Sequence, residues 1–389
     1  MKALILGGGI GGIEAAIAFR KEGFEVELVS DREYLFVYPI AIWIPVGTAR
    51  FEDVAVPLDD LARRHGFSWT LDRVTAITPD TGSITLEKAG ERRDFDILVL
   101  ALGAGKMKHE GMQNTLSICG APQQSLALKA RIDALILQGG GRIAVGFGGN
   151  PKDPSAVRGG PGFEFVFNLH HVLKKRGIRD RFTLTFFAPM AEPGARMGPK
   201  ALGMLGKMFT RCGIQTHFGS KILGFDPDGV RFEDGSKVDS DLTMFIAAGD
   251  GHPVIKASTL PVNDAGFVRT NDFLEVEGRP GWYAVGDTAA LEGPDWKAKQ
   301  GHVAEVMARQ AAHNAAVTHL GRSGTRRGYQ AHLSILCVMD MGNGAGFVHR
   351  DDRKARLWSL PFVGHWMKKG WGWYYRNSKM RYFPRLPGM

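Results

Sequence analysis

The chain opens on a pattern of apolar and polar positions in which strands alternate with a helix. Residues 1–30, MKALILGGGIGGIEAAIAFRKEGFEVELVS, predict an apolar strand, a glycine turn, a helix and a second strand. Short strands are expected within 83–100, and the apolar segments 142–146 and 182–188 predict strands of a second unit. Helices are expected at about 163–175, 200–212 and 298–320. Strands that alternate with helices favour an α/β fold with parallel sheets.

The first glycine turn carries a dinucleotide-binding spacing. Gly7, Gly9 and Gly12 fit Gly-x-Gly-x-x-Gly between a strand and a helix. Glycines allow a tight turn and let the backbone approach a pyrophosphate, whose charge lies at the helix N-terminus. An acidic ribose ligand is expected near the end of the second strand, where Ser30 and Asp31 both fall. The sequence leaves the choice between these two residues open.

A second glycine-rich stretch follows the strand at 142–146. The segment VGFGGNPKDPSAVRGGPGFEF contains Gly146, Gly148 and Gly149, but Pro151 and polar residues stand where a third glycine and a helix are expected. A proline lacks an amide donor and disfavours helix at the residue before it. The pattern therefore argues against a working second dinucleotide loop.

The charge of the chain is uneven. The 389 residues carry a formal net charge of +9, and nine Lys or Arg residues with no Asp or Glu lie within 353–389. The rest of the chain balances 40 basic against 40 acidic groups. The basic excess therefore predicts one local anionic contact and argues against a general nucleic-acid-binding surface.

The basic segment is also aromatic. The stretch LWSLPFVGHWMKKGWGWYYRNSKMRYF holds four of the eight tryptophans. Aromatic rings beside cations suit the interface of an anionic membrane, although a basic and aromatic protein interface has the same composition. No apolar run reaches the roughly 18 residues that cross a bilayer, and nothing at the N-terminus reads as a signal peptide.

The three cysteines do not form a framework. Cys119, Cys212 and Cys337 are too few and too scattered for a set of disulfides or a zinc site, and no metal-ligand spacing is present. Cys212 is expected to pack at a helix end.

Three separated motifs occur along the chain: GGGIGG at 7–12, LVLALGA at 98–104 and YAVGDTAAL at 283–291. Together they resemble the tandem-Rossmann flavoproteins of the pyridine nucleotide-disulfide reductase superfamily. The resemblance covers about residues 1–325 and implies bound FAD, with the carboxylate of Asp287 at the ribityl chain of the flavin.

Further segments resemble the sulfide:quinone oxidoreductases in particular. They are DREYLFVYPIAIWIPVG at 31–47, NTLSICGAP at 114–122, KQGHVAE at 299–305 and SILCVMDMGNGAG at 334–346. This resemblance implies an FAD-binding Rossmann domain (1–110 and 245–325), a second Rossmann-like domain (111–244) and a C-terminal region (326–389) at the quinone and membrane interface. It also implies a monotopic, peripheral protein of the inner membrane of a prokaryote, and it allows a homo-oligomer.

The resemblance also implies which residues form the site. The expected cofactor-binding residues are Gly7, Gly9, Gly11, Gly12, Ser30, Asp31, Pro39, Val74, Ala101, Gly103, Gly286, Asp287 and Lys299. Expected catalytic residues are Cys337, Cys119, Glu164 and Lys299, and expected quinone-binding residues are Phe347, Phe362 and Trp366. Each of the four catalytic candidates has a plainer alternative: a buried inert thiol for the cysteines, a carboxylate suited to a helix dipole for Glu164, and a solvated helix-face lysine for Lys299.

One family feature is missing. The family's middle redox cysteine precedes a Gly-Pro and a Glu; Gly160, Pro161 and Glu164 are present here, but the cysteine is not. The leading hypothesis is electron transfer from sulfide or a related sulfur compound through FAD to a quinone. The alternatives are a type II NADH:quinone oxidoreductase, and the flavin subunit of a complex like flavocytochrome c sulfide dehydrogenase.

Overall fold

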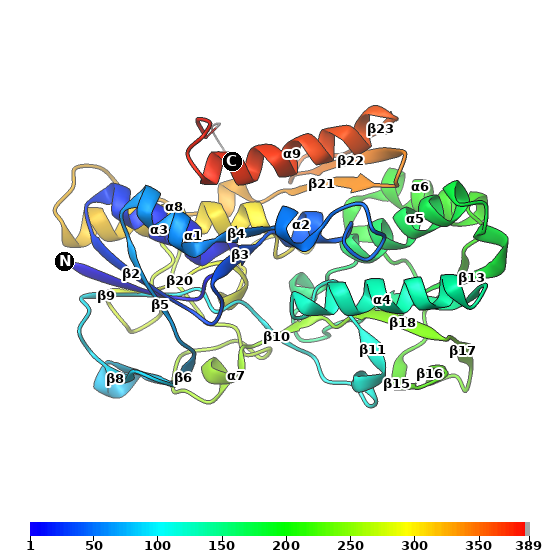
Figure 1. The fold of residues 1–389 in the computed structure, drawn as a ribbon. Helices are drawn as coiled ribbons and strands as arrows, with labels where there is room; N and C mark the ends of the chain where they lie inside the picture. The colour runs from blue at the N-terminus through cyan, green and yellow to red at the C-terminus, as the bar shows by residue number, and fades with distance from the viewer. Residues whose placement is uncertain (386–389) are drawn as a thin grey trace.

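Two parallel sheets of five strands form the frame of the computed structural model, which describes residues 1–385 (Figure 1). The first sheet lies on the left in Figure 1. Its strands, in order, are β20 (Trp282–Ala284), β9 (Ile97–Leu100), β1 (Lys2–Leu6), β2 (Glu25–Ser30) and β5 (Ser68–Leu71). The inner strands β1 and β9 are almost entirely apolar and buried, as expected of a parallel sheet with covered faces.

Two long helices pack together beside the first sheet. They are α1 (Ile10–Glu22), which joins β1 to β2, and α8 (Gly301–His319). The small side chains of both helices allow a close approach, since Ala15 and Ala16 of α1 and Ala311 and Ala312 of α8 have no exposed surface. This packing places the start of α8 next to the first glycine turn, because the Cβ of Ala304 lies 3.6 Å from the position a Cβ would take at Gly11.

The second sheet lies on the right in Figure 1. Its strands, in order, are β11 (Thr115–Leu116), β18 (Leu242–Ile246), β12 (Gly141–Phe147), β13 (Phe182–Ala188) and β14 (Gln215–Phe218). The helices of this half are α4 (Gln123–Leu137), α5 (Gly160–Lys175) and α6 (Pro199–Arg211). The expected strands and helices are therefore present, with ends that differ by up to three residues.

Smaller elements connect and flank the two halves. The antiparallel sheets are β3 (Tyr34–Phe36) with β4 (Ala55–Pro57), β6 (Val74–Thr78) with β7 (Ser83–Leu86) and β8 (Gly90–Arg92), β10 (Gly105–Lys106) with β19 (Gly249–Asp250), and β15 (Ile222–Asp226) with β16 (Gly229–Phe232) and β17 (Lys237–Asp239). The short helices are α2 (Tyr38–Ala41), α3 (Leu58–His65) and α7 (Pro253–Lys256).

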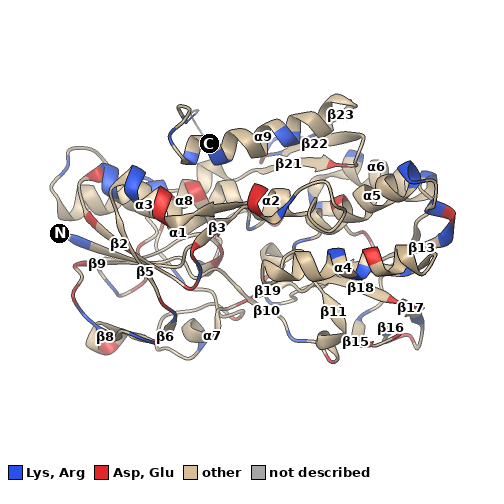
Figure 2. Cartoon of the chain, in the orientation of Figure 1, with Lys and Arg blue, Asp and Glu red and all other residues tan. Residues whose placement is uncertain are grey.

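The C-terminal region adds structure that the sequence pattern did not predict. The antiparallel sheet of β21 (Ile335–Asp340), β22 (Gly344–Arg350) and β23 (Ala355–Pro361) is followed by α9 (Val363–Lys379). In Figure 1 this unit lies along the top of the molecule, and α9 carries lysines and arginines but no acidic residue in Figure 2. Among residues 1–385, no helix combines the length and apolar character that crossing a membrane requires.

Helix α9 has two contrasting sides. Gly364, Lys368, Gly372, Tyr375 and Lys379 face inward and are buried. Their spacing of three or four residues places them on one side of the helix. Gly364 is required there, because a Cβ would lie 2.6 Å from the backbone nitrogen of Ala345. The opposite side exposes Val363, Trp366, Met367 and Trp373.

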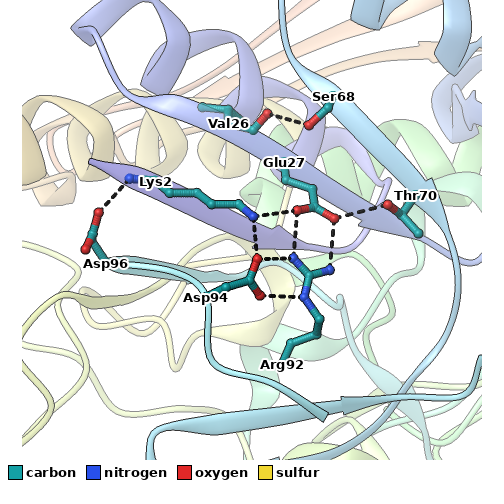
Figure 3. A network of polar contacts seen from close by, with 8 residues as sticks. All are labelled: Lys2, Val26, Glu27, Ser68, Thr70, Arg92, Asp94 and Asp96. Atoms are coloured by element: carbon teal, nitrogen blue, oxygen red, sulfur yellow. Dashed lines mark hydrogen bonds and ion pairs between the residues drawn. The ribbon is translucent and has the colours of Figure 1, made fainter. Parts of the chain in front are cut away.

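An ion network ties strands of the first sheet to the strand β8 and its following turn (Figure 3). Glu27 of β2 accepts from Arg92 at 2.9 Å and pairs with Lys2 at 3.1 Å, and both cations also contact Asp94. The hydrogen bond from Arg92 is the main reason that the pKa of Glu27 falls to about 2. This network joins the inner strands β1 and β2 to the segment after β8 and lies apart from the residues discussed next.

Candidate active site

The first glycine turn is shaped for close approach of a ligand to backbone. Gly7 has φ +114°, and a Cβ there would lie 2.3 Å from the carbonyl oxygen of Ala101. At Gly12 a Cβ would lie 1.8 Å from the carbonyl oxygen of Gly7. Gly9 caps α1 with open space at its Cβ position, and the first turn of the helix has no acidic side chain. The N-terminus of α1 therefore offers its amides to an anion.

The two candidate ribose ligands differ in their surroundings. Ser30 is buried, and its hydroxyl donates to the carbonyl of Arg32 at 2.7 Å. Asp31 is exposed and pairs with Arg32 at 3.5 Å. The Ser30 hydroxyl thus closes the turn after β2, while the Asp31 carboxylate is available to a ligand.

The other expected cofactor-binding residues surround the same turn or lie on neighbouring elements. Ala101 and Gly103 follow β9, and the amide of Gly103 donates to the hydroxyl of Thr288 at 2.8 Å. Pro39 is partly exposed in α2, and Val74 is buried at the start of β6. The bond between Gly103 and Thr288 joins two of the motifs on which the flavoprotein resemblance depends.

Asp287 pairs with a residue that the sequence did not nominate. Its carboxylate forms an ion pair with Arg158, which precedes α5. Gly286 has φ +64°, which lets the chain turn sharply after β20 and present Asp287. The pairing brings the residues before α5 to the ends of the strands of the first sheet.

Lys299 is buried rather than solvated, so the plainer alternative for this residue is wrong. Its side chain is 8 % exposed, donates to the carbonyl of Ala289 and lies 4.0 Å above the ring of Phe267. Burial lowers the pKa of Lys299 to about 7. The residue also precedes α8, which begins at Gly301.

A cationic cluster lies next to the buried thiol of Cys119. Burial raises the pKa of this thiol, while the charges of Lys106 and Arg158 oppose that shift. Burial and the nearby charge of Arg158 lower the pKa of Lys106 to about 8. The hydroxyl of Tyr38 donates to the carbonyl of Gly120 at 2.9 Å, which fixes the segment that carries Cys119. Sequence reasoning missed Lys106 and Arg158, because neither lies in a recognised motif.

Cys337 and Glu164 meet across the C-terminal unit. The thiol of Cys337 lies 3.7 Å from Oε1 of Glu164, whose other oxygen pairs with Lys368 of α9. Burial raises the pKa of Glu164 to about 7, although Lys368 opposes this shift, and burial raises the pKa of Cys337 to about 12. The dipole alternative for Glu164 is wrong, since its carboxylate is buried between a thiol and an ammonium group.

A second buried carboxylate lies in the same strand as Cys337. Asp340 accepts from Nε1 of Trp43 at 2.7 Å and contacts Nδ1 of His365 at 2.9 Å. The amide of Asn168 donates to its carbonyl at 3.2 Å. Three residues from separate parts of the sequence thus converge on Asp340, which explains why no local pattern predicted this cluster.

The two groups of residues are neighbours. The amide of Leu336, one residue before Cys337, donates to Oε1 of Gln300, one residue after Lys299, at 3.3 Å. The negative charge of Glu164 also acts on the thiol of Cys119. Cys337, Glu164, Cys119 and Lys299 therefore belong to one region of the structure.

The second glycine stretch does not form a dinucleotide loop in this structure. Residues 148–159 separate β12 from α5. Asn150 accepts from the amides of Lys152 and Asp153, and Asp153 accepts from the amide of Ser155. Arg196 donates to the carbonyls of Pro154 and Val157, each at 2.8 Å. Several backbone amides of this stretch, those of Lys152, Asp153 and Ser155, are thus bonded within the protein.

The expected quinone-binding residues lie on the outer side of the C-terminal unit. Phe347 of β22 is partly exposed, and its ring centroid lies 5.4 Å from that of Trp358. Phe362 and Trp366 are 76 % and 69 % exposed. Phe362 holds φ +61° in the left-handed region, an unfavourable conformation for a bulky residue.

Comparisons of the sequence and the fold with known proteins identify the family of this chain. The family model described as pyridine nucleotide-disulphide oxidoreductase matches residues 1–316. The chain belongs to this family. It is 28 % identical to the sulfide-quinone reductase of Aquifex aeolicus over 98 % of this chain and 89 % of that protein. The structure of the sulfide:quinone oxidoreductase from Aquifex aeolicus superposes with a TM-score of 0.85 and 25 % identity, covering 98 % of this chain and 91 % of that one.

A second group of relatives is more distant. The type II NADH:quinone oxidoreductase Ndh of Mycobacterium tuberculosis is 24 % identical over 75 % of this chain and 68 % of that protein. As a member of the pyridine nucleotide-disulphide oxidoreductase family, the chain is an FAD-dependent oxidoreductase.

The residues around the first glycine turn fit FAD. A Cβ at Gly12 would collide with the backbone of the turn, and the side of Gly9 is open for a pyrophosphate. Asp287 follows β20, and Lys299 precedes α8. The charges of these two side chains suit the polar edge of a flavin.

Proposed function

We propose that the chain passes electrons from sulfide, or a related sulfur compound, through FAD to a quinone at a membrane surface. The observation that carries this proposal is the contact between the Cys337 thiol and Glu164 in the region of Lys299. A thiol next to a base is what uptake of a sulfur nucleophile requires. The sulfide-quinone reductase relative, which matches over 98 % of this chain, supports the same donor and acceptor.

The second glycine stretch argues against NADH as the donor. The pyrophosphate of NADH binds to free amides at the N-terminus of a helix, and that helix directly follows the strand. Here residues 148–159 intervene, and the side chains of Asn150 and Asp153 occupy several of their amides. This arrangement weighs against the type II NADH:quinone oxidoreductase alternative, although such enzymes are among the relatives.

Each side chain of the site has a role in this proposal. Burial keeps the Cys337 thiol protonated, so a base in contact with it is needed, and Glu164 takes that proton. Hydrosulfide then forms a sulfur–sulfur bond to the Cys337 thiolate, which yields a persulfide. This step releases two electrons and the sulfide proton, and the proton goes to solvent. FAD, when bound, would supply the two-electron acceptor, and the ammonium group of Lys299 would stabilise negative charge beside it.

Because the middle cysteine is missing, the site lacks the redox disulfide of the sulfide:quinone oxidoreductases. Without a partner thiol in residues 145–165, Cys337 has no disulfide through which to take up sulfide. Cys337 instead accepts sulfur alone, and the charges of Lys106 and Arg158, which act on the neighbouring thiol of Cys119, would attract the anionic donor. This assigns the donor side to a single thiol near two cations, and it leaves the acceptor side to the C-terminal unit.

The outer side of the C-terminal unit is proposed as the membrane and quinone face. Val363, Trp366, Met367 and Trp373 form an exposed stripe on α9, which we call the outer stripe, and Phe362 and Trp358 are exposed beside it. Lys369 lies 5.4 Å from the ring of Trp366. Exposed aromatic residues with neighbouring lysines match an anionic lipid interface. A quinone dissolved in lipid would enter past Phe347, Phe362 and Trp366.

A turnover assay with purified holoenzyme tests the donor and the acceptor together. Reduction of a soluble ubiquinone analogue is followed under anaerobic conditions with either sulfide or NADH as the donor. We expect quinone reduction that depends on sulfide and a rate with NADH at the level of the blank. A rate with NADH that exceeds the rate with sulfide would contradict the proposal and favour the type II NADH:quinone oxidoreductase alternative.

Flotation with liposomes tests the membrane face. The double variant Phe362→Ser, Trp366→Ser removes two exposed rings without touching the buried side of α9. Leu137→Ser is the matched control, because Leu137 is 89 % exposed at the end of α4. The double variant should lose most of its binding to anionic vesicles while the control keeps it. Equal binding by both variants would mean that the outer stripe is not the membrane contact.

A further inference from the structure

Arg196 lies in the loop between β13 and α6 and donates to backbone carbonyls of two other segments. Its Nη1 donates to the carbonyl of Pro154 at 2.8 Å and to the carbonyl of Lys297 at 3.1 Å, and its Nη2 donates to the carbonyl of Val157 at 2.8 Å. A guanidinium group is planar and presents its donors in a fixed fork, so it can hold several carbonyls in one arrangement. One side chain thus joins the segment before α5 to the loop before α8.

Both segments carry a cation of the candidate active site. The first segment continues directly into Arg158, and Lys297 precedes Lys299 by two residues. The two segments also meet directly, since the amide of Lys299 donates to the carbonyl of Ser155 at 3.0 Å. The charge of Arg158 also acts on Lys299. The contacts of Arg196 therefore fix the backbone from which both cations extend.

The loop that carries Arg196 is itself held in place. Arg196 lies in a single turn of 3-10 helix between Gly194 (φ +102°) and Gly198 (φ +95°). A Cβ at Gly198 would lie 2.6 Å from the Cβ of Ala355 in β23, so the loop packs closely against the C-terminal unit. Nη1 of Arg350 in β22 donates to the carbonyl of Arg196 at 2.6 Å. The C-terminal unit therefore fixes the base of the Arg196 side chain.

The position of the Lys299 ammonium group depends on the loop that Arg196 holds. This group is buried, donates to the carbonyl of Ala289 and lies 4.0 Å from the centroid of the Phe267 ring. A buried cation acts strongly on charge that develops close to it, and the effect falls with distance. A displacement of the loop before α8 would therefore weaken the stabilisation of negative charge by Lys299.

We propose that Arg196 is a positioning residue that holds Lys299 in place and thereby sets the reduction potential of the flavin. The inference rests on the proposed function, in which Lys299 stabilises negative charge beside the bound cofactor. Arg196 acts through the carbonyls of Lys297 and Val157 and needs no contact with the cofactor itself. Removal of its side chain frees the two segments from each other, so the ammonium group of Lys299 is no longer held in one place and the potential falls.

The experiment measures the flavin midpoint potential of purified holoenzyme by anaerobic titration at pH 7. The variants are Arg196→Met, Arg196→Lys, Lys299→Met and the double variant Arg196→Met, Lys299→Met. Arg179→Met is the matched control, because Arg179 also donates to three backbone carbonyls but lies after the C-terminal end of α5. Flavin content and thermal unfolding are measured for each variant. If Arg196→Met does not retain flavin, Arg196→Lys takes its place in the double variant.

A positioning role predicts a specific set of results. Arg196→Met should lower the potential by at least about half of the shift in Lys299→Met, because the interaction falls with distance. The double variant should have the same potential as Lys299→Met alone, since Arg196 acts through that lysine. Arg196→Lys keeps the charge but lacks the fork of donors, so its potential should lie between those of Arg196→Met and the wild type. Arg179→Met should lose stability but keep the wild-type potential.

Other results overturn the inference. A wild-type potential in Arg196→Met, beside a lowered potential in Lys299→Met, contradicts the inference alone and leaves the proposed function standing. Additive shifts in the double variant also contradict it, because they mark a direct effect of the Arg196 charge. A lowered potential in Arg179→Met marks a general loss of packing and counts against it as well. If Lys299→Met keeps the wild-type potential, the role of Lys299 in the proposed function fails, and the inference fails with it.

Discussion

Glu14 of α1 offers the sharpest test of how the C-terminal unit is held in place. It has no exposed surface and forms ion pairs with Lys379 of α9, with Arg385 at 2.7 Å and with Arg309 of α8 at 3.0 Å. Burial opposes its ionisation, but Lys379 and Arg385 outweigh that effect and lower the pKa of Glu14 to about 2. Glu14 is therefore the acidic centre of the contact between α1, α8 and the end of the chain.

The size of the effect follows from the pKa. A fall from 4.5 to about 2 corresponds to about 3 kcal/mol of differential stabilisation of the carboxylate. That figure agrees with the roughly 3–5 kcal/mol lost when one partner of a buried ion pair is removed. Glu14→Gln should therefore destabilise the attachment of α9 by about 3 kcal/mol at pH 7. Because the folded-state pKa is lowered, this contribution is present above pH 4.5 and is lost as the pH falls toward 2.

The assay combines denaturant unfolding with limited proteolysis. Unfolding is followed by tryptophan fluorescence at pH 7 and pH 3, and a lysine-specific protease reports the release of α9 at Lys368 and Lys369. Glu27→Gln is the matched control, because Glu27 also pairs with a lysine and an arginine but contacts neither α9 nor its partners (Figure 3). We expect faster cleavage in Glu14→Gln alone, and a stability difference from the wild type that shrinks at pH 3. Cleavage at the wild-type rate with a change below about 0.5 kcal/mol would refute the reasoning.

Three further predictions concern the cofactor and the thiol. Gly12→Ala should abolish flavin binding, because its Cβ would lie 1.8 Å from the carbonyl oxygen of Gly7; Gly203→Ala, with open space around it, should keep full flavin content by absorbance. Lys299→Met should lower the flavin midpoint potential by about 30 mV or more, which corresponds to about 1.4 kcal/mol for a two-electron couple. Because the pKa of Lys299 is lowered to about 7, this difference should be largest below pH 7 and shrink above it; a constant difference across pH would contradict the assignment. Cys337→Ser should lose sulfide-driven flavin reduction by at least about 100-fold while dithionite-reduced flavin is still reoxidised by quinone, and full turnover with sulfide would remove the role of the thiol.

Local signals predicted the first half of the site well. The turn from Gly7 to Gly12 and the Asp287 motif each span only a few residues. Their geometry therefore depends on residues that are adjacent in the sequence. The polar stretch after Gly149 was likewise expected not to continue into a helix, and α5 begins only at Gly160. Such features depend on backbone chemistry at neighbouring positions, which a single sequence displays directly.

The second half of the site depends on long-range contacts that no local pattern shows. Asp340 gathers Trp43, Asn168 and His365, which lie far apart in the chain. One signal could have been found, since Lys368 and Lys379 are eleven residues apart, about three helical turns, and so share one side of a helix. A helix with buried lysines requires acidic partners elsewhere, and here they are Glu164 and Glu14.

The central proposal is that this FAD-dependent oxidoreductase accepts electrons from sulfide at Cys337 and does not use NADH as its donor. The most direct test is the flavin absorbance of the oxidised holoenzyme after anaerobic mixing with sulfide or with NADH, before any quinone is added. The account predicts rapid bleaching by sulfide and none by NADH at micromolar concentrations. Bleaching by NADH together with no response to sulfide would contradict it.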